Sequence, residues 1–307
     1  MRQITDTIFM VRPVAFRMNE QTAVNNYFQK NMQNPDLNLW AAKEFDDFVV
    51  KLRDAGVNVI VVDDISEDNT PDSIFPNNWV SFHEDGQIAL YPMFAENRRK
   101  ERRLQYFAEL EKAGFRINDI VDYTAAEEDN VFLEGTGSLI LDRHNQKAYC
   151  AISPRADEDL LIEFCEDFEF TPVIFNAYQS VGEKRLPIYH TNVMMCLAEE
   201  FAVICLDTID DKKERKNVIN HLKQDKKEII SITQEQMHEF AGNMLQVQGK
   251  DKKYLVMSER AHRSLNHDQI SKIEKHCEIL SSKIETIETC GGGSARCMMA
   301  EVFLPRA

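Results

Sequence analysis

The sequence predicts an α/β protein in which five similar units close into one ring-shaped domain covering residues 1–307. Three observations support this prediction. Hairpin patterns recur at even intervals, helical patterns fill the intervals, and the strand that the last unit lacks is found at the N-terminus. The repeat is considered first, because overlooking it would misassign the whole fold.

Four segments share one pattern: a polar residue, an apolar strand, a polar turn and a second apolar strand. They begin at Asn78, Glu134, His190 and Asn243, and a fifth start, CMMAEVFLP, begins at Cys297. The intervals between these first residues are 56, 56, 53 and 54 positions. Such even spacing indicates that the five residues occupy equivalent places in a repeat.

Helical patterns lie between the hairpins. Apolar residues recur at helical spacing in LNLWAAKEFDDFVVKLRDAG and in NRRKERRLQYFAELEKAG, and each stretch ends in glycine. Similar patterns run over residues 157–168, 210–223 and 258–277, and a short apolar strand such as NVIVVDD follows most of them. The unit is therefore strand, strand, helix, strand. TIFMVRP near the N-terminus would supply the missing strand of the fifth unit, and ring closure would remove exposed sheet edges.

Composition excludes several classes of protein. The chain is 43% hydrophobic over 307 residues, which is enough for a substantial core, and its net charge of −15 argues against a nucleic-acid or anionic-membrane partner. The seven cysteines are scattered, without the spacing of a disulfide framework or a zinc site. The N-terminal stretch lacks the apolar core of a signal peptide, and no segment is long enough to span a membrane. We expect a reduced, soluble, cytoplasmic protein, while its oligomeric state is not readable.

The repeat predicts where the chemistry lies. Five equivalent positions around a pseudo-axis converge on one central pit. Three of them are Glu134, His190 and Cys297. A thiol, an imidazole and a carboxylate are the groups that nucleophilic thiol catalysis requires. We therefore predict a catalytic triad of Cys297, His190 and Glu134.

Other polar residues are weaker candidates. Cys290 lies seven positions upstream of Cys297 and out of register. Gly291–Gly293 would form a flexible turn or present backbone amides to a ligand. The run RRKERR is interpreted as a solvated helix face, and Arg155 either as a surface ion-pair partner or as a residue near the mouth of the ring. No compact ligand pair supports a zinc site at His190, Cys196 and Cys297, so we expect no metal and no organic cofactor.

Taken together, these motifs resemble the amidinotransferase and guanidino-modifying superfamily, whose fold is a five-bladed α/β propeller, the pentein fold. GGGSARC is similar to the nucleophile motif of arginine deiminases, FLEGTG to a Leu-Glu-Gly segment and YHTN to a His-x-Asp motif. DSIFPNNW corresponds to the substrate loop of the family. The resemblance implies that substrate is bound by the following residues: Asp72, Phe75, Asn78, Asn192 and Arg155, the last holding the α-carboxylate.

The sequence departs from the deiminase pattern at two positions, where Asn78 and Asn192 stand in place of aspartates. A guanidinium carries only donors and a positive charge, so carboxylates suit it. A ureido group is neutral and has a carbonyl acceptor, so an amide can pair with it without leaving a buried charge unpaired. The chain is most similar to the bacterial citrulline-utilisation hydrolases of this superfamily. Succinylarginine dihydrolases, however, also carry an asparagine in this region and act on an arginine derivative.

The sequence therefore predicts a cysteine hydrolase that converts citrulline to ornithine without a cofactor. Two alternatives stay open. One is a guanidine substrate, through arginine deimination, dimethylarginine hydrolysis or amidino transfer. The other is a non-catalytic ring that binds an amino acid. The roles of Asn243 and Cys290 are not assigned, although a backbone or capping role is expected for Asn243.

Overall fold

The computed structural model describes residues 1–32, 34–65 and 68–307. In this part of the chain the strands form five three-stranded sheets and one two-stranded hairpin, β9 (Tyr178–Val181) with β10 (Lys184–Pro187). In spatial order the sheets are β17 (Ala300–Glu301), β1 (Thr7–Arg12) and β2 (Asn58–Asp63); β3 (Val80–Phe82), β4 (Gln87–Leu90) and β5 (Asp119–Asp122); β6 (Leu139–Asp142), β7 (Lys147–Ile152) and β8 (Thr171–Asn176); β11 (Met195–Leu197), β12 (Phe201–Ile204) and β13 (Glu228–Ser231); and β14 (Leu245–Gln248), β15 (Lys253–Ser258) and β16 (Glu278–Ser282).

All five sheets have the same topology. The middle strand pairs antiparallel with the first strand and parallel with the third. The predicted hairpins are confirmed, because each antiparallel pair is joined by the polar turn that the sequence marks. Parallel pairing requires a crossover, which the helical segments provide.

The N-terminal strand completes the fifth sheet, as predicted. β1 pairs antiparallel with β17, with Ile8 opposite Glu301 and Phe9 opposite Ala300. Closure into a continuous sheet, in contrast, is not found among the described residues, where the sheets remain separate. The first strands are only two to four residues long, and neighbouring ones pack together, as β3 does with β17 and β11 with β6 and β14.

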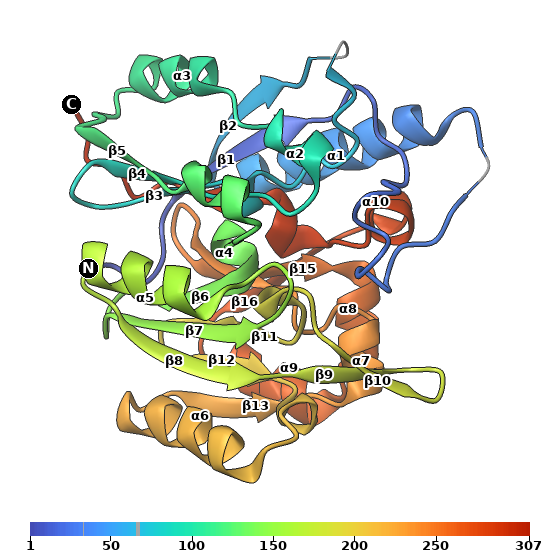
Figure 1. Ribbon diagram of the computed structural model, residues 1–307, viewed down its shortest axis with the longest axis vertical. Coiled ribbons are helices and arrows are strands. Elements are labelled where there is room, and N and C mark those ends of the chain that lie inside the picture. Colours follow the sequence, from blue (N-terminus) through green and yellow to red (C-terminus); the bar gives the residue numbers. More distant parts are fainter. Residues whose placement is uncertain (33, 66–67) are drawn as a thin grey trace.

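The helices cover the sheets from outside, and Figure 1 shows α3, α5 and α6 at the periphery with α4 near the centre of the view. The described helices are α1 (Leu37–Asp54), α2 (Glu96–Arg99), α3 (Phe107–Lys112), α4 (Gly135–Ser138), α5 (Glu158–Asp167), α6 (Lys212–Gln224), α7 (Gln234–His238), α8 (Glu259–Ser264), α9 (His267–Glu274) and α10 (Glu285–Gly291). α1 buries Phe45, Phe48 and Leu52 along one face, as its helical pattern predicts.

Two predicted helices are interrupted. The stretch from residue 97 to 114 divides into α2, a 3-10 turn at Leu104–Tyr106 and α3. It breaks because Arg98 and Glu101 turn inward and are buried, so the run RRKERR is not a solvated helix face. The stretch 258–277 divides into α8 and α9, because Asn266 forms a capping box with Gln269 and starts a new helix.

Candidate active site

The five equivalent residues precede the first strand of each sheet, and short helical turns bring four of them together. Asn78 ends the turn η2 (Pro76–Asn78), Glu134 precedes α4, His190 precedes η5 (Thr191–Val193), and Cys297 lies in η7 (Ala295–Met298). The turn η2 contacts both α4 and η7, and α4 also contacts η5. These contacts bring the equivalent residues to one place, as the repeat predicts.

A small cavity lies where these turns meet. Its walls include Asp72, Phe75, Asn78, Arg98, Arg155, Tyr189, His190, Cys297 and the run Gly291–Gly293. It has a volume of about 10 Å³, which is enough for about one water molecule. An amino-acid substrate is larger than this, so the segment above the cavity must move before substrate enters.

His190 and Glu134 are directly bonded. The imidazole Nε2 lies 2.6 Å from Glu134 Oε2, and both side chains are buried. Glu134 Oε1 also accepts the backbone N–H of Phe94 over 3.0 Å. Burial alone would raise the pKa of Glu134, but the Arg155 charge and the His190 bond hold it well below its usual range. Glu134 is therefore ionised and fixes the orientation of the imidazole.

The imidazole is neutral at physiological pH. Burial lowers the pKa of His190 to about 4, and the bond and charge of Glu134 offset only part of this effect. With Nε2 donating to Glu134, the free nitrogen is Nδ1, on the side of Gly137. A Cβ at Gly137 would approach Nδ1 to 2.9 Å, so glycine is required there. A neutral imidazole with a free nitrogen can act as a general base.

Cys297 is buried and receives two amide contacts at its sulfur. Asn243 Nδ2 lies 3.2 Å from Sγ and Asn192 Nδ2 lies 3.4 Å from it. Asn243 is itself held by the backbone N–H of Arg296, which donates to Oδ1 over 3.0 Å. N–H donors at a sulfur favour its thiolate form. A backbone or capping role was expected for Asn243, but its side-chain amide faces the thiol.

The Gly-rich run lies against the ring of Phe75. A Cβ on Gly291 or Gly293 would come within 2.8 or 2.9 Å of that ring, and Gly292 has a φ of 64°. The carbonyl of Gly292 accepts from Tyr189 Oη over 2.7 Å. Glycine is therefore needed for close approach and for the left-handed backbone. Cys290 is buried just upstream and does not line the cavity.

Arg155 and Asp72 lie on the cavity wall and are covered by the N-terminal segment. Arg155 Nη2 donates to the carbonyl of Thr22 over 2.9 Å and Nε donates to Asn25 Oδ1 over 2.9 Å. Asp72 Oδ2 accepts from Asn19 over 2.8 Å and from Thr22 over 3.0 Å, while its Oδ1 has no partner among the described residues. Arg155 is fully buried, so the surface ion-pair interpretation is wrong.

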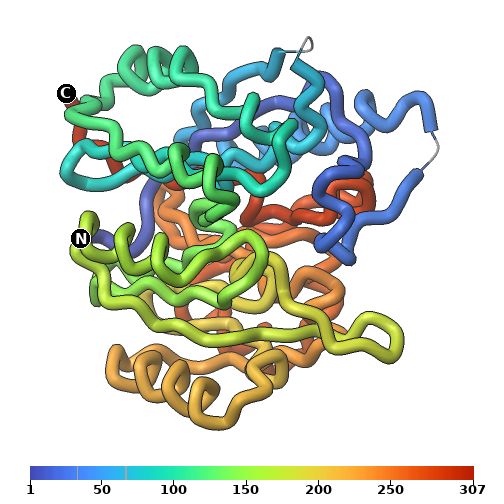
Figure 2. The backbone as a smooth tube through the Cα atoms, in the orientation of Figure 1, coloured from blue at the N-terminus to red at the C-terminus, as the bar shows by residue number. Residues whose placement is uncertain are grey.

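The covering segment, residues 16–29, was not identified from the sequence. Asn26 Nδ2 donates to the carbonyl of Gly292 over 3.2 Å and Gln29 Nε2 to that of Gly291 over 2.9 Å. Figure 2 shows this dark-blue segment beside the red C-terminal segment. Its short polar side chains carry no periodic pattern, so no sequence signal indicates that it covers the site.

Arg98 is the other residue that sequence reasoning missed. It was assigned to a solvated helix face, but its guanidinium is buried behind Asn78 and donates to Asn78 Oδ1 over 2.8 Å. A buried arginine with no repeat partner cannot be told from a surface arginine in a basic run.

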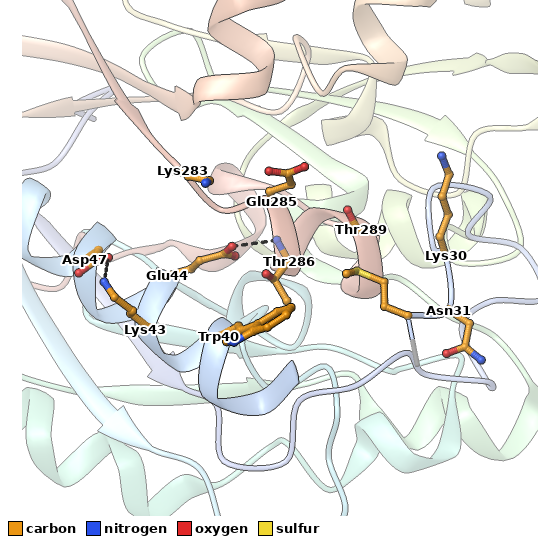
Figure 3. Close-up of a pocket in the computed structure, with 11 residues that line it drawn as sticks. Lys30, Asn31, Trp40, Lys43, Glu44, Asp47, Lys283, Glu285, Thr286 and Thr289 are labelled. Carbon is orange, nitrogen blue, oxygen red and sulfur yellow. Dashed lines mark hydrogen bonds and ion pairs between the residues drawn. The ribbon is translucent and has the colours of Figure 1, made fainter. Parts of the chain in front are cut away.

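A wider surface groove of about 720 Å³ lies between α1 and α10 (Figure 3). It contains no cysteine or histidine among its described walls, so it lacks the groups for thiol chemistry. Within it Glu44 accepts the backbone N–H of Thr286 over 2.9 Å and thereby anchors the start of α10. That helix ends at Gly291, so this contact helps to fix the Gly-rich run.

Two further findings concern the described residues alone. No group of three or more His, Cys, Asp or Glu side chains there could hold a metal ion. None of the helices is both long and apolar enough to cross a membrane.

Comparison with known proteins identifies the family. A family profile described as N,N dimethylarginine dimethylhydrolase, eukaryotic, matches residues 12–304. No curated protein matches the chain.

Several solved structures share the fold. The apo structure of ArgZ, an arginine dihydrolase in cyanobacteria, gives a TM-score of 0.74 at 16% identity over 98% of this chain and 41% of that chain. The N-terminal domain of ArgZ, solved as a mutant bound to substrate, gives 0.70 at 16% identity over 97% of this chain and 99% of that one. A mutant of the enzyme DDAH from Pseudomonas aeruginosa, complexed with citrulline, gives 0.65 at 11% identity over 98% and 100%. The chain thus spans about two fifths of full-length ArgZ.

At these identities the structural likeness establishes the pentein fold. The family profile covers nearly the whole sequence and so carries the assignment further. The protein belongs to the N,N-dimethylarginine dimethylhydrolase family, within the pentein superfamily of cysteine-dependent amidinohydrolases.

Proposed function

We propose that the protein hydrolyses citrulline to ornithine, with Cys297 as nucleophile. The observation that carries this proposal is the pair of neutral amides at the site, Asn78 on the cavity wall and Asn192 beside the sulfur. An amide pairs with a neutral ureido group without leaving a buried charge, whereas a guanidinium calls for carboxylates.

The proposed reaction begins with attack of the Cys297 sulfur on the ureido carbon, while His190 takes the thiol proton. His190 then returns this proton to the δ-nitrogen as the C–N bond breaks, which releases ornithine and leaves an S-carbamoyl enzyme. Water, deprotonated by His190, attacks this intermediate and regenerates the thiol. The carbamate so formed breaks down to carbon dioxide and ammonia.

Other residues would bind the substrate and stabilise charge. Arg155 would receive the α-carboxylate and Asp72, with its unpartnered Oδ1, the α-ammonium, once residues 16–29 have moved. Phe75 would pack on the aliphatic stem. The Gly291–Gly293 backbone would stabilise developing oxyanion charge. No metal or organic cofactor enters this scheme.

We also infer that the five sheets are blades of one pentein propeller that forms a single catalytic domain over residues 1–307. Their shared topology and the contacts between their first strands support this arrangement. All seven cysteines are free thiols, which supports a cytoplasmic location.

A second candidate is a guanidine substrate, favoured by the description of the matching family and by the name of ArgZ, an arginine dihydrolase. Separate incubations with citrulline, arginine and dimethylarginine, followed by assay of ornithine, citrulline and ammonia, decide between the two. We expect ornithine from citrulline and no product from the guanidines. Turnover of arginine or dimethylarginine without turnover of citrulline would overturn the proposal.

A further inference from the structure

Arg98 is the one buried cation at the cavity that the proposed mechanism leaves without a role. It lies in α2, outside the five repeated positions, and only 2% of it is exposed. A buried guanidinium is expensive unless its donors are satisfied, and these are.

Glu101 holds the guanidinium in place. Arg98 Nε lies 3.0 Å from Glu101 Oε1 and Nη2 lies 2.9 Å from Oε2, so the two side chains form a fork-to-fork pair. Nη2 also donates to the carbonyl of Phe75 over 3.2 Å. These contacts fix the plane of the guanidinium and direct Nη1 at Asn78.

This contact determines which way round the Asn78 amide stands. Arginine has only donors, so the group it faces at 2.8 Å must be the amide oxygen. The amide nitrogen then lies on the opposite side. One of its N–H groups donates to Asn77 Oδ1 over 3.1 Å. A Cβ on Gly137 would approach the same Nδ2 to 2.4 Å and His190 Nδ1 to 2.9 Å, so the nitrogen lies on the His190 side.

The consequence concerns what Asn78 can bind. Its oxygen already accepts from a cation, and one N–H remains to donate. A donor suits the carbonyl oxygen of a ureido group, and it has nothing to bind on a guanidinium, which lacks an acceptor. The Arg98 charge behind the amide also repels a second cation.

We propose that Arg98, held by Glu101, is a positioning residue that sets substrate specificity by locking the Asn78 amide with its N–H toward the substrate. This inference rests on the proposed function, because it explains why a ureido group is preferred. It adds that the preference depends on Arg98 as much as on Asn78.

The test is the ratio of kcat/KM for citrulline to that for arginine, with the inhibition constant of arginine used where its turnover is not measurable. The variant Arg98→Met/Glu101→Leu removes the pair without leaving a charge unpaired. We expect its ratio to fall at least tenfold, since the amide is free to turn. Arg98→Lys keeps the charge but cannot bond Glu101 through a fork and also reach Asn78, so its ratio falls in the same direction by less.

Arg99→Met is the matched control. Arg99 lies on the same helix, donates to the carbonyl of Met93 over 3.1 Å and does not touch Asn78, so its ratio should stay at the wild-type value. Circular dichroism and thermal melting establish which variants are folded. A merely structural role lowers both substrates equally and leaves the ratio unchanged. An unchanged ratio in the folded Arg98 variants therefore overturns the inference, while wild-type enzyme that does not hydrolyse citrulline overturns the proposed function itself.

Discussion

Asn78 and Asn243 are the same residue type at equivalent places in two of the five units, yet their amides face different groups. In both, a donor occupies the carbonyl oxygen: Arg98 at Asn78, and the backbone N–H of Arg296 at Asn243. The nitrogen of Asn243 lies 3.2 Å from Cys297 Sγ, whereas that of Asn78 lies beside Gly137 on the cavity wall. The repeat determines where each amide stands, and its neighbours determine what it can bind. On this view Asn78 acts on the substrate and Asn243 acts on the nucleophile.

The largest effect is expected where the two amides would lose their common purpose. Cys297→Ala removes the sulfur, and the rate of ornithine formation should fall at least about 10³-fold. Cys290→Ala is the control, since that buried thiol does not line the cavity and should change the rate by no more than a few-fold. Comparable losses in both variants would argue against Cys297 as the nucleophile.

Asn78→Asp tests the substrate side of the comparison. A carboxylate cannot donate to the ureido oxygen, so kcat/KM for citrulline should fall roughly 10²-fold, as expected for the loss of one donor to a developing oxyanion. Because Arg98 would pair with the new carboxylate, we expect little gain in arginine turnover. Steady-state kinetics on both substrates measure this. Citrulline activity that survives the substitution would show that Asn78 does not contact the ureido group.

Asn243→Ala tests the nucleophile side. Loss of one N–H donor to the sulfur disfavours the thiolate, so kcat should fall about tenfold while the citrulline-to-arginine ratio stays constant. Iodoacetamide labelling of Cys297 should slow in parallel. A change in the ratio would mean that Asn243, like Asn78, binds substrate, and the distinction between the two amides would fail.

The smallest effect within the working range is that of pH. The pKa of His190 is lowered to about 4, so the imidazole stays neutral from pH 8 down to about pH 5 and the acid limb of kcat/KM should be flat there. Below pH 4 the imidazole takes up a proton, and the rate should fall about tenfold per pH unit. An acid limb centred near pH 6.5 would show that His190 is not the buried neutral base.

The repeat accounts for what could be predicted. Register alone identified Glu134, His190 and Cys297, because a periodic pattern carries positional information, and the structure brings these residues together around one cavity. Their catalytic roles remain a prediction. Arg98 could not be predicted, because it belongs to a segment between repeats, and its burial depends on pairing with Glu101 rather than on any pattern.

The turn chemistry of the helices was predicted less well than their existence. The capping box at Asn266 divides a stretch that reads as one helix, and inward rotation of Arg98 and Glu101 divides another. His83 was expected to be solvated near a turn, but it is buried and stacks on Phe168 with ring centroids 4.0 Å apart. In each case a tertiary contact overrides the local pattern.

The covalent intermediate tests the central claim most directly. Enzyme mixed with citrulline labelled at the ureido carbon, quenched in acid during turnover and digested, can be analysed by tandem mass spectrometry. We predict one labelled carbamoyl group on Cys297 and none on the other six cysteines. Label on a different cysteine, or ornithine formed while Cys297 never carries label, would contradict the account.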